Sequence, residues 1–161
     1  MAYFQLFMDE ELLNLMVHET NTYAEQIIII AIADESTTKG SRLNDWYPTT
    51  KEEMQQFLGV ILWMGLDKKP RLSDYWRKSS LYWSEAAKIM TRNRFEMLLR
   101  VWHFSDNEAC PTGDRLFKIQ SVVDLLNKIF KKTVSHGDKV CIDETMIPFR
   151  GRLKFRQYIK E

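Results

Sequence analysis

The sequence predicts a mainly α-helical fold that ends in a β-hairpin. Several stretches carry apolar side chains at the three- and four-residue spacing of an amphipathic helix. After Gly137 this spacing gives way to a short apolar run and then to alternation, which is typical of strands. The 161 residues are 45% hydrophobic and 28% charged, so the chain is globular by composition and long enough to bury a core.

The first predicted helix covers much of the stretch from Asp9 to Ala33. Its side chains at helical spacing are Leu12, Leu15, Met16, Glu19 and Tyr23. The run from Ile27 to Ile30 is ambiguous, because β-branched residues also favour strands. The apolar run to Ala33 is far too short to span a bilayer, so no membrane partner is expected.

Three further helices follow. Thr50 with Glu53 forms a capping-box pattern, which predicts a helix from about Lys51 to Met64 that stops near Gly65. Thr91 is a plausible N-cap for the next helix. The apolar stripe behind it consists of Phe95, Leu98, Leu99 and Trp102. The stripe of the last helix consists of Ile119, Val122, Val123, Leu126, Ile129 and Phe130.

The hairpin is predicted from two segments. Residues 139–142 form a short apolar run, and residues 152–159 alternate with period two. Pro148 and Gly151 lie between them and favour a turn-containing link. A two-stranded hairpin is only marginally stable alone, so we expect it either to pack on the helices or to belong to a larger sheet.

Charge is divided unevenly along the chain, although the formal net charge is only +1. Residues 1–66 contain three basic and ten acidic side chains, and residues 67–161 contain 20 basic and 12 acidic ones. This asymmetry weakly favours a nucleic-acid partner for the second half, since solvated helices often carry a similar bias.

Two features of the C-terminal segment suggest chemistry on nucleic acid. Asp143 follows the apolar run, where metal-dependent nucleases place a carboxylate for a hard divalent cation. The pattern alone nevertheless favours the plainer interpretation, in which Asp143 and Glu144 end a strand and face water. A row of basic residues then follows, spaced for one face of a strand and suited either to DNA phosphates or to a solvated edge. The row consists of Arg150, Arg152, Lys154, Arg156 and Lys160.

The aromatic pairs, the cysteines and the histidines give weaker indications of function. Tyr75-Trp76 and Tyr82-Trp83 lie among basic residues, so base stacking is conceivable, but packing in the core or between helices is favoured. Cys110 and Cys141 are too isolated for a disulfide framework or a CxxC metal site, and we expect reduced thiols. The three histidines fit no hydrolase motif, and no glycine-rich phosphate loop is present.

Taken in order, a set of short motifs resembles the piggyBac class of DNA transposases and their domesticated relatives, over nearly the whole chain. These motifs are Glu19-Thr20-Asn21 with Tyr23-Ala24, Met64-Gly65, the run from Pro70 to Trp76, Met90 to Phe95, Trp102 to Asp106, Asp114 to Ile119, Ile142 to Arg152, and Gln157-Tyr158-Ile159.

The resemblance implies an architecture. It identifies residues 1–136 with a helical dimerisation and DNA-binding region, and residues 137–161 with the first strands of a truncated RNase H-like catalytic core. It also implies a nuclear protein whose partners are DNA at transposon ends and a second copy or a related transposase.

The resemblance also implies a chemistry, in which three aspartates hold divalent metal, normally Mg²⁺, for cutting and joining DNA. Asp143 matches the first of these aspartates, and no aspartate follows it. We therefore expect that this chain does not hold the metal tightly and does not cut DNA alone. The other hypothesis is a domesticated, non-catalytic module for protein interaction or dimerisation.

Overall fold

The computed structural model describes residues 2–34, 40–135, 137–139 and 141. Within these residues the chain forms helices joined by turns and irregular loops, and no strand. The elements are α1 (Ala2–Phe7), α2 (Glu10–Ala33), η1 (Arg42–Asp45), α3 (Lys51–Leu66), η2 (Leu72–Trp76), η3 (Ser80–Tyr82), α4 (Ala86–Ile89), α5 (Arg92–Val101) and α6 (Phe117–Thr133), where η marks a 3₁₀-helix.

The predicted C-terminal β-hairpin, with its RNase H-like strands, is wrong. The described residues are helical without a strand, and Lys139 and Cys141 of the first predicted strand have irregular backbone. Both residues are exposed, so they do not pack on the helices. An isolated hairpin buries too little apolar surface to be stable, which accounts for the absence of a strand there. The second predicted strand, residues 152–159, lies outside the described residues.

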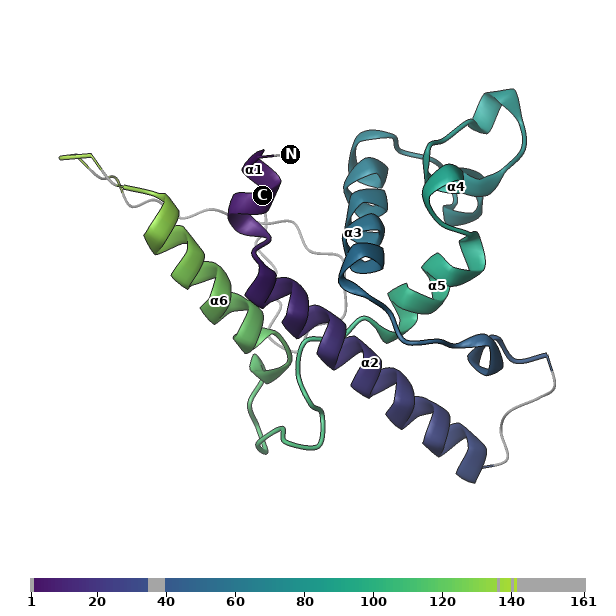
Figure 1. The fold of residues 1–161 in the computed structure, drawn as a ribbon, viewed down its shortest axis with the longest axis horizontal. Helices are drawn as coiled ribbons and strands as arrows, with labels where there is room; N and C mark the ends of the chain where they lie inside the picture. The colour runs from purple at the N-terminus through teal and green to yellow at the C-terminus, as the bar shows by residue number, and fades with distance from the viewer. Residues whose placement is uncertain (1, 35–39, 136, 140, 142–161) are drawn as a thin grey trace, which may run out of the picture.

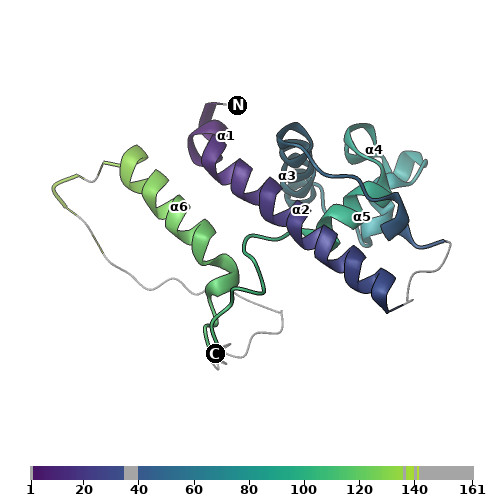
Figure 2. The same cartoon turned by 60° about the horizontal axis from the view of Figure 1, so that its bottom comes forward.

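Helix α2 is the central element of the molecule. In Figures 1 and 2 it runs between α6 on one side and the group formed by α3, α4 and α5 on the other, and it contacts α3, α5 and α6. Asp9 caps its start, because the Asp9 carboxylate accepts a hydrogen bond of 2.9 Å from the Leu12 amide. The isoleucine run that was ambiguous in sequence is helical.

The core lies where α2, α3 and α5 meet. Phe57 of α3 and Phe95 of α5 are almost fully buried, with ring centroids 5.2 Å apart. Trp102 packs edge-on against Phe57 at 5.3 Å, and Trp76 approaches Phe95 at 5.2 Å. Aromatic rings that pack edge-on or tilted stabilise a fold beyond what the burial of their apolar surface contributes. This cluster therefore fixes α3 and α5 against each other.

The segment between α3 and α5 forms a small lobe of short helices, residues 67–90. The Tyr75 hydroxyl accepts a hydrogen bond from the Lys69 amide at 3.0 Å and donates to the Asp67 carbonyl at 2.6 Å. The Trp76 indole donates to the Met90 carbonyl at 2.8 Å. Buried backbone groups in this irregular stretch thereby obtain partners, as a folded loop requires.

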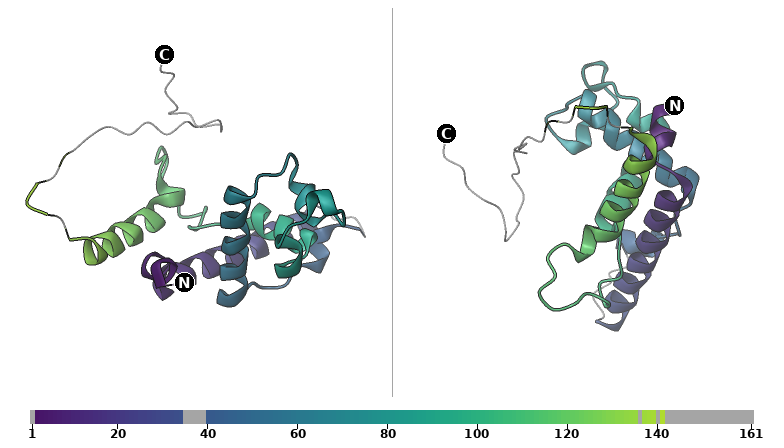
Figure 3. Two further views of the ribbon diagram at one scale, coloured as in Figure 1. Left: turned by 90° about the horizontal axis from the view of Figure 1, so that it is seen from above. Right: turned by 90° about the vertical axis from the view of Figure 1, so that its left-hand side faces the viewer.

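Helix α6 packs on α1 and α2, and the right-hand view of Figure 3 shows it running alongside α2. Phe130 meets Phe7 of α1 with ring centroids 5.7 Å apart, and Lys128 forms an ion pair of 2.7 Å with Glu11. Ile129 is the buried residue of this helix. None of the helices in the described part of the chain has the length and apolar character needed to cross a membrane.

Candidate functional site

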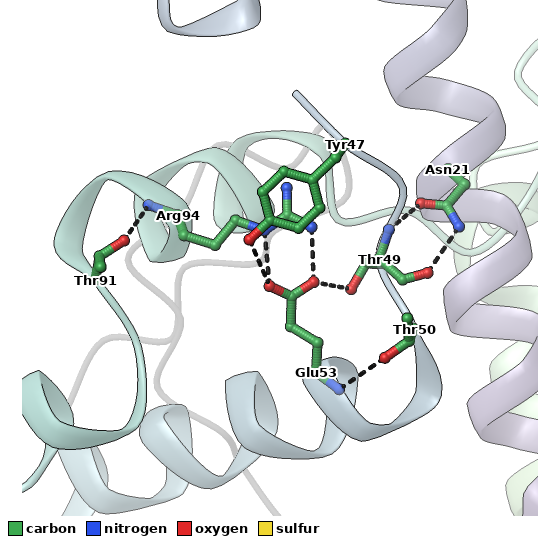
Figure 4. A network of polar contacts seen from close by, with 7 residues as sticks. All are labelled: Asn21, Tyr47, Thr49, Thr50, Glu53, Thr91 and Arg94. Atoms are coloured by element: carbon green, nitrogen blue, oxygen red, sulfur yellow. Dashed lines mark hydrogen bonds and ion pairs between the residues drawn. The ribbon is translucent and has the colours of Figure 1, made fainter. Parts of the chain in front are cut away.

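A polar network joins α2, α3 and α5 around one ion pair (Figure 4). Arg94 of α5 donates hydrogen bonds from Nε and Nη2 to the two carboxylate oxygens of Glu53 on α3, at 2.8 and 2.6 Å. The Arg94 side chain is 7% exposed and that of Glu53 is 17% exposed. Such two-pronged contacts between guanidinium and carboxylate are stronger than single ones and fix the orientation of both groups.

Two aromatic rings also contact Arg94. The guanidinium carbon lies 3.6 Å from the centroid of the Tyr47 ring and 4.6 Å from that of Trp46. Figure 4 places the Tyr47 ring across the guanidinium group. A flat cation can stack on aromatic rings and still use its edge for hydrogen bonds, so the loop before α3 is held to α5.

The network extends to α2 through Thr49. The Thr49 hydroxyl donates to Glu53 at 2.7 Å. Its backbone amide donates to Asn21 Oδ1 at 2.8 Å, and its carbonyl accepts from Asn21 Nδ2 at 3.0 Å. The side-chain amide of Asn21 thus pairs with both backbone hydrogen-bonding groups of Thr49, and this links the loop before α3 to the middle of α2.

The charge on Glu53 is maintained by these contacts. Burial raises the pKa of this carboxyl, but hydrogen bonds from Arg94 and Thr49, the positive charge of Arg94 and the Tyr47 hydroxyl outweigh burial and hold the pKa below its usual value. Glu53 is therefore an ionised partner for Arg94 at neutral pH.

This arrangement serves to position helices. The described residues bring together no group of three or more histidine, cysteine or acidic side chains that could hold a metal ion. The Glu53 carboxylate is occupied by Arg94, Thr49 and Tyr47, and Arg94 uses Nε and Nη2 on that carboxylate, while its buried Nη1 has no hydrogen-bond partner among the described residues. We therefore assign the Glu53–Arg94 network a structural role.

A second set of contacts, between α2 and the segment after α5, brings together two of the motifs noted in the sequence. Thr20 of α2, which is fully buried, accepts a hydrogen bond from the His103 amide at 3.3 Å and donates to the His103 carbonyl at 3.5 Å. The Tyr23 ring stacks on the His103 ring with centroids 4.0 Å apart. Gln26 reaches Asp106 at 3.3 Å. The motif at residues 19–24 therefore contacts the motif at residues 102–106 within the fold, through Thr20 and Tyr23.

Two groups of exposed cations lie in the second half of the chain. One is α6, where Lys118, Lys131 and Lys132 are exposed and a shallow open depression is lined by Lys128, Lys131 and Lys132 with Asp124 and Asn127. The other is the lobe at residues 67–90, with exposed Lys68, Arg77 and Lys78. These surfaces follow the division of charge seen in the sequence.

The residues predicted for chemistry lie outside the described residues. These are Asp143, Arg150, Arg152, Lys154, Arg156 and Lys160. No described contact bears on their roles, which stay predictions, as does the division of the chain at residue 137.

The aromatic pairs noted in the sequence separate in the structure. Tyr75 is buried and Trp76 half-buried, which confirms the packing interpretation for that pair. Trp63 and Trp102 are also half-buried. Trp83 is exposed, contrary to that interpretation.

The importance of Glu53, Trp46 and Tyr47 was not evident from the sequence. The sequence indicates Glu53 as one half of a capping box, and the Glu53 amide does donate a hydrogen bond to the Thr50 hydroxyl, at 3.3 Å. Its carboxylate instead binds Arg94, a stronger partner than a backbone amide. One signal was present, namely an arginine in the first turn of the amphipathic helix, directly before the buried Phe95.

Comparison with known proteins agrees with this order of motifs. A model of the family described as Transposase IS4 matches residues 1–161. The chain is 28% identical to human PiggyBac transposable element-derived protein 3 over 157 residues, covering 97% of this chain and 24% of that protein. It is 28% identical to human PiggyBac transposable element-derived protein 2 over 155 residues, which are 96% of this chain and 24% of that protein. It is 25% identical to human PiggyBac transposable element-derived protein 5 over 145 residues, which are 90% of this chain and 26% of that protein.

The chain thus spans about a quarter of the length of the curated relatives it matches. No solved structure matches it significantly. The family match covers every residue, and the relatives match over nearly the whole chain. The chain therefore belongs to the Transposase IS4 family, as a relative of the PiggyBac transposable element-derived proteins.

Proposed function

We propose that this chain is a DNA-binding part of a piggyBac-type transposase, or of a protein derived from one, and that it acts in the nucleus on transposon ends. In this proposal the basic second half holds the sugar-phosphate backbone, without reading base sequence. Contacts to phosphates position a protein on DNA and supply much of its affinity.

One observation carries the proposal. Lys118, Lys131 and Lys132 are exposed along α6, and no carboxylate among the described residues forms an ion pair with any of them. Lys128, one turn before Lys132, is engaged by Glu11. Unneutralised lysines on one helix, in a chain of this family, are suited to phosphate contacts.

The proposed catalytic contribution of this chain is a single carboxylate. By resemblance, Asp143 would be one ligand of the divalent metal that supplies the chemistry of DNA cutting, and the basic residues after it would contact the DNA backbone. Asp143 is the one carboxylate of this chain that matches a catalytic position implied by the resemblance. We therefore propose binding without cutting for this chain.

Fluorescence anisotropy of a labelled DNA duplex tests the proposal. Affinity should fall as salt rises, giving a straight line in a log–log plot with a negative slope. The double substitution of Lys131→Ala and Lys132→Ala should make the slope shallower by up to about 2, since each lost phosphate contact contributes about 0.9. Lys51→Ala, which removes a lysine paired with Glu10 in the acidic half, is the matched control and should leave the slope unchanged.

The same titration can also contradict the proposal. If the chain binds no duplex at low salt, or binds with a flat salt dependence, the proposal is wrong. The other candidate function, a protein-interaction or dimerisation module, would then gain support. That candidate is favoured by exposed apolar side chains on α2 and α3 beside a net acidic first half. They are Ile29, Ile30, Ile32, Leu62 and Leu66.

A further inference from the structure

We propose that Trp83 is a stacking platform for an unpaired DNA base, and that Lys68 and Lys78 of the same lobe, exposed and without an ion pair in the described part of the chain, attract the phosphates of that strand. The inference rests on the proposed function, since it takes the ligand to be DNA. It adds a second mode of contact, to a base instead of to the backbone, and it assigns this contact to the lobe at residues 67–90.

Trp83 differs from the other tryptophans of the chain. All five lie in the described part, and Trp83 is the exposed one, at 56%. The others are half-buried and engaged within the fold: Trp46 with Arg94, Trp63 with Ser84, Trp76 with Met90 and Trp102 with Phe57. An indole left in water has a large apolar surface that gains free energy when it is covered.

Cations lie against the rings of Tyr82 and Trp83. The Lys88 ammonium lies 5.0 Å from the centroid of the Trp83 ring, and the Arg77 guanidinium lies 5.0 Å from that of Tyr82. An aromatic ring next to a positive charge offers a nucleotide its two requirements, a face for the base and a charge for the phosphate.

The backbone that carries Trp83 is held in place. Ser84 is buried, and its hydroxyl accepts hydrogen bonds from the Trp63 indole at 3.2 Å and from the Ala86 amide at 3.3 Å. Ala86 is fully buried. The ring is therefore presented from a fixed position, so little conformational entropy is lost when a ligand covers it.

The net positive charge of the lobe favours a negatively charged ligand such as nucleic acid. Residues 67–90 contain six basic and three acidic side chains. The acidic ones pair with Lys69, Arg77 and Lys88 at 2.9, 3.7 and 3.0 Å. Lys68 and Lys78 are exposed and form no ion pair within the described residues, which leaves the surface positive around the aromatic rings.

An unpaired base fits this surface better than a duplex does. The bases of a duplex already stack on each other, so their faces are covered, whereas an unpaired base exposes both faces. Enzymes that process DNA often hold such bases on aromatic side chains. The occupant we infer is therefore a single-stranded or extruded nucleotide.

The test compares three labelled ligands of equal length on the 161-residue chain: oligothymidylate, an abasic strand with the same number of phosphates, and a duplex. The wild-type chain should bind oligothymidylate more tightly than the abasic strand. Trp83→Ala should weaken binding of oligothymidylate by about 5- to 150-fold, close to the level of the abasic strand. Binding of the duplex should not change.

Matched variants distinguish aromatic stacking from non-specific apolar contact. Trp83→Phe should retain most of the preference for bases and Trp83→Leu should lose it, because only an aromatic ring stacks. Ile29→Ala removes an apolar side chain that is 66% exposed at the far end of α2, and it should have no effect. Circular dichroism should confirm that all variants are folded.

The outcomes distinguish this inference from the proposed function. If Trp83→Ala leaves binding of oligothymidylate unchanged while the duplex still binds, the stacking role is wrong and the DNA-binding function stands. If Trp83→Leu binds as Trp83→Phe does, the contact is merely apolar, as for a protein partner, and the inference fails. If neither DNA ligand binds at low salt, both proposals fail.

Discussion

Arg94 and Glu53 are 41 residues apart in the chain, and each supplies the main partner of the other inside the fold. The pair joins α5 to α3, while Thr49 and Asn21 extend the same network to α2. A buried charge that loses its partner is far more costly than an exposed one, so this contact makes the mutual placement of three helices specific.

Removal of Arg94 should strongly destabilise the protein. We expect Arg94→Ala to lower the free energy of unfolding by about 3 kcal/mol, because Glu53 is then left half-buried without its cation. Arg94→Lys should recover only part of the loss, since an ammonium cannot make both hydrogen bonds and stack on Tyr47. Urea denaturation followed by circular dichroism measures both.

The control for this prediction is Arg92→Ala. Arg92 forms a 2.6 Å ion pair with Glu96 on the same helix but is largely exposed, so its loss should cost no more than about 0.5 kcal/mol. Equal effects of the two alanine substitutions would show that burial does not distinguish the pairs.

Acid should destabilise the protein partly through Glu53. Its pKa is lowered in the folded state, so its contribution to stability is complete above the usual glutamate pKa of 4.5 and is lost as the pH falls through the lowered value. Hydrogen bonds from Arg42 and Arg92 lower the pKa of Glu96 in the same direction. Stability should therefore decrease as the pH is lowered below about 5.

Glu53→Gln isolates the contribution of this one carboxyl. The variant should be less stable at pH 7 but should lose less of its remaining stability on acidification than the wild type does. Denaturation series at pH 7, 5, 4 and about 3 measure this difference. Parallel curves for the two proteins would mean that Glu53 does not titrate in this range.

The joint between α2 and the segment after α5 should depend on the Thr20 hydroxyl. Thr20→Val keeps the shape of the side chain but leaves the His103 amide without its acceptor, so we expect a loss of about 1–3 kcal/mol. Thr133→Val, at an exposed position that ends α6, should change stability little. Thermal unfolding of both variants tests this, and similar melting temperatures would contradict it.

The chain should not cut DNA by itself. Only Asp143 matches a catalytic position implied by the family resemblance, and one carboxylate does not enclose the metal ions of such a reaction. Supercoiled plasmid incubated with purified chain and Mg²⁺ should remain supercoiled. Nicking that disappears in Asp143→Ala would refute this.

Local signals in the sequence identified the long helices well. Thr50 and Thr91, which the sequence indicates as N-caps, each accept a hydrogen bond from an amide in the first turn of the helix they precede. Asp9, at the start of the first predicted helix, does the same. The structure confirms a helix near each predicted range, although α3 ends at Leu66, two residues beyond the prediction. Caps and apolar spacing act within a few residues, so they can be recognised without the rest of the fold.

Features that depend on distant partners were less predictable. The lobe at residues 67–90 is built from short helices whose order comes from contacts such as that of Tyr75 with Asp67, and no periodic pattern reports these. The alternation after Gly137 predicted a hairpin, but alternation becomes a strand only when a partner strand or a packing surface is present. The exposed position of Trp83 likewise depends on the fold around Ser84.

The contact of Thr20 with His103 has a consequence for synthesis of the protein. The two residues are 83 positions apart, so at about 5–20 residues per second roughly 4 to 17 s pass between their incorporation at the ribosome. During that interval the side of α2 that carries Thr20 and Tyr23 cannot reach its final packing against His103. A nascent chain that stalls before His103 therefore exposes unfinished surface on its central helix, and it becomes a substrate for chaperones and proteases.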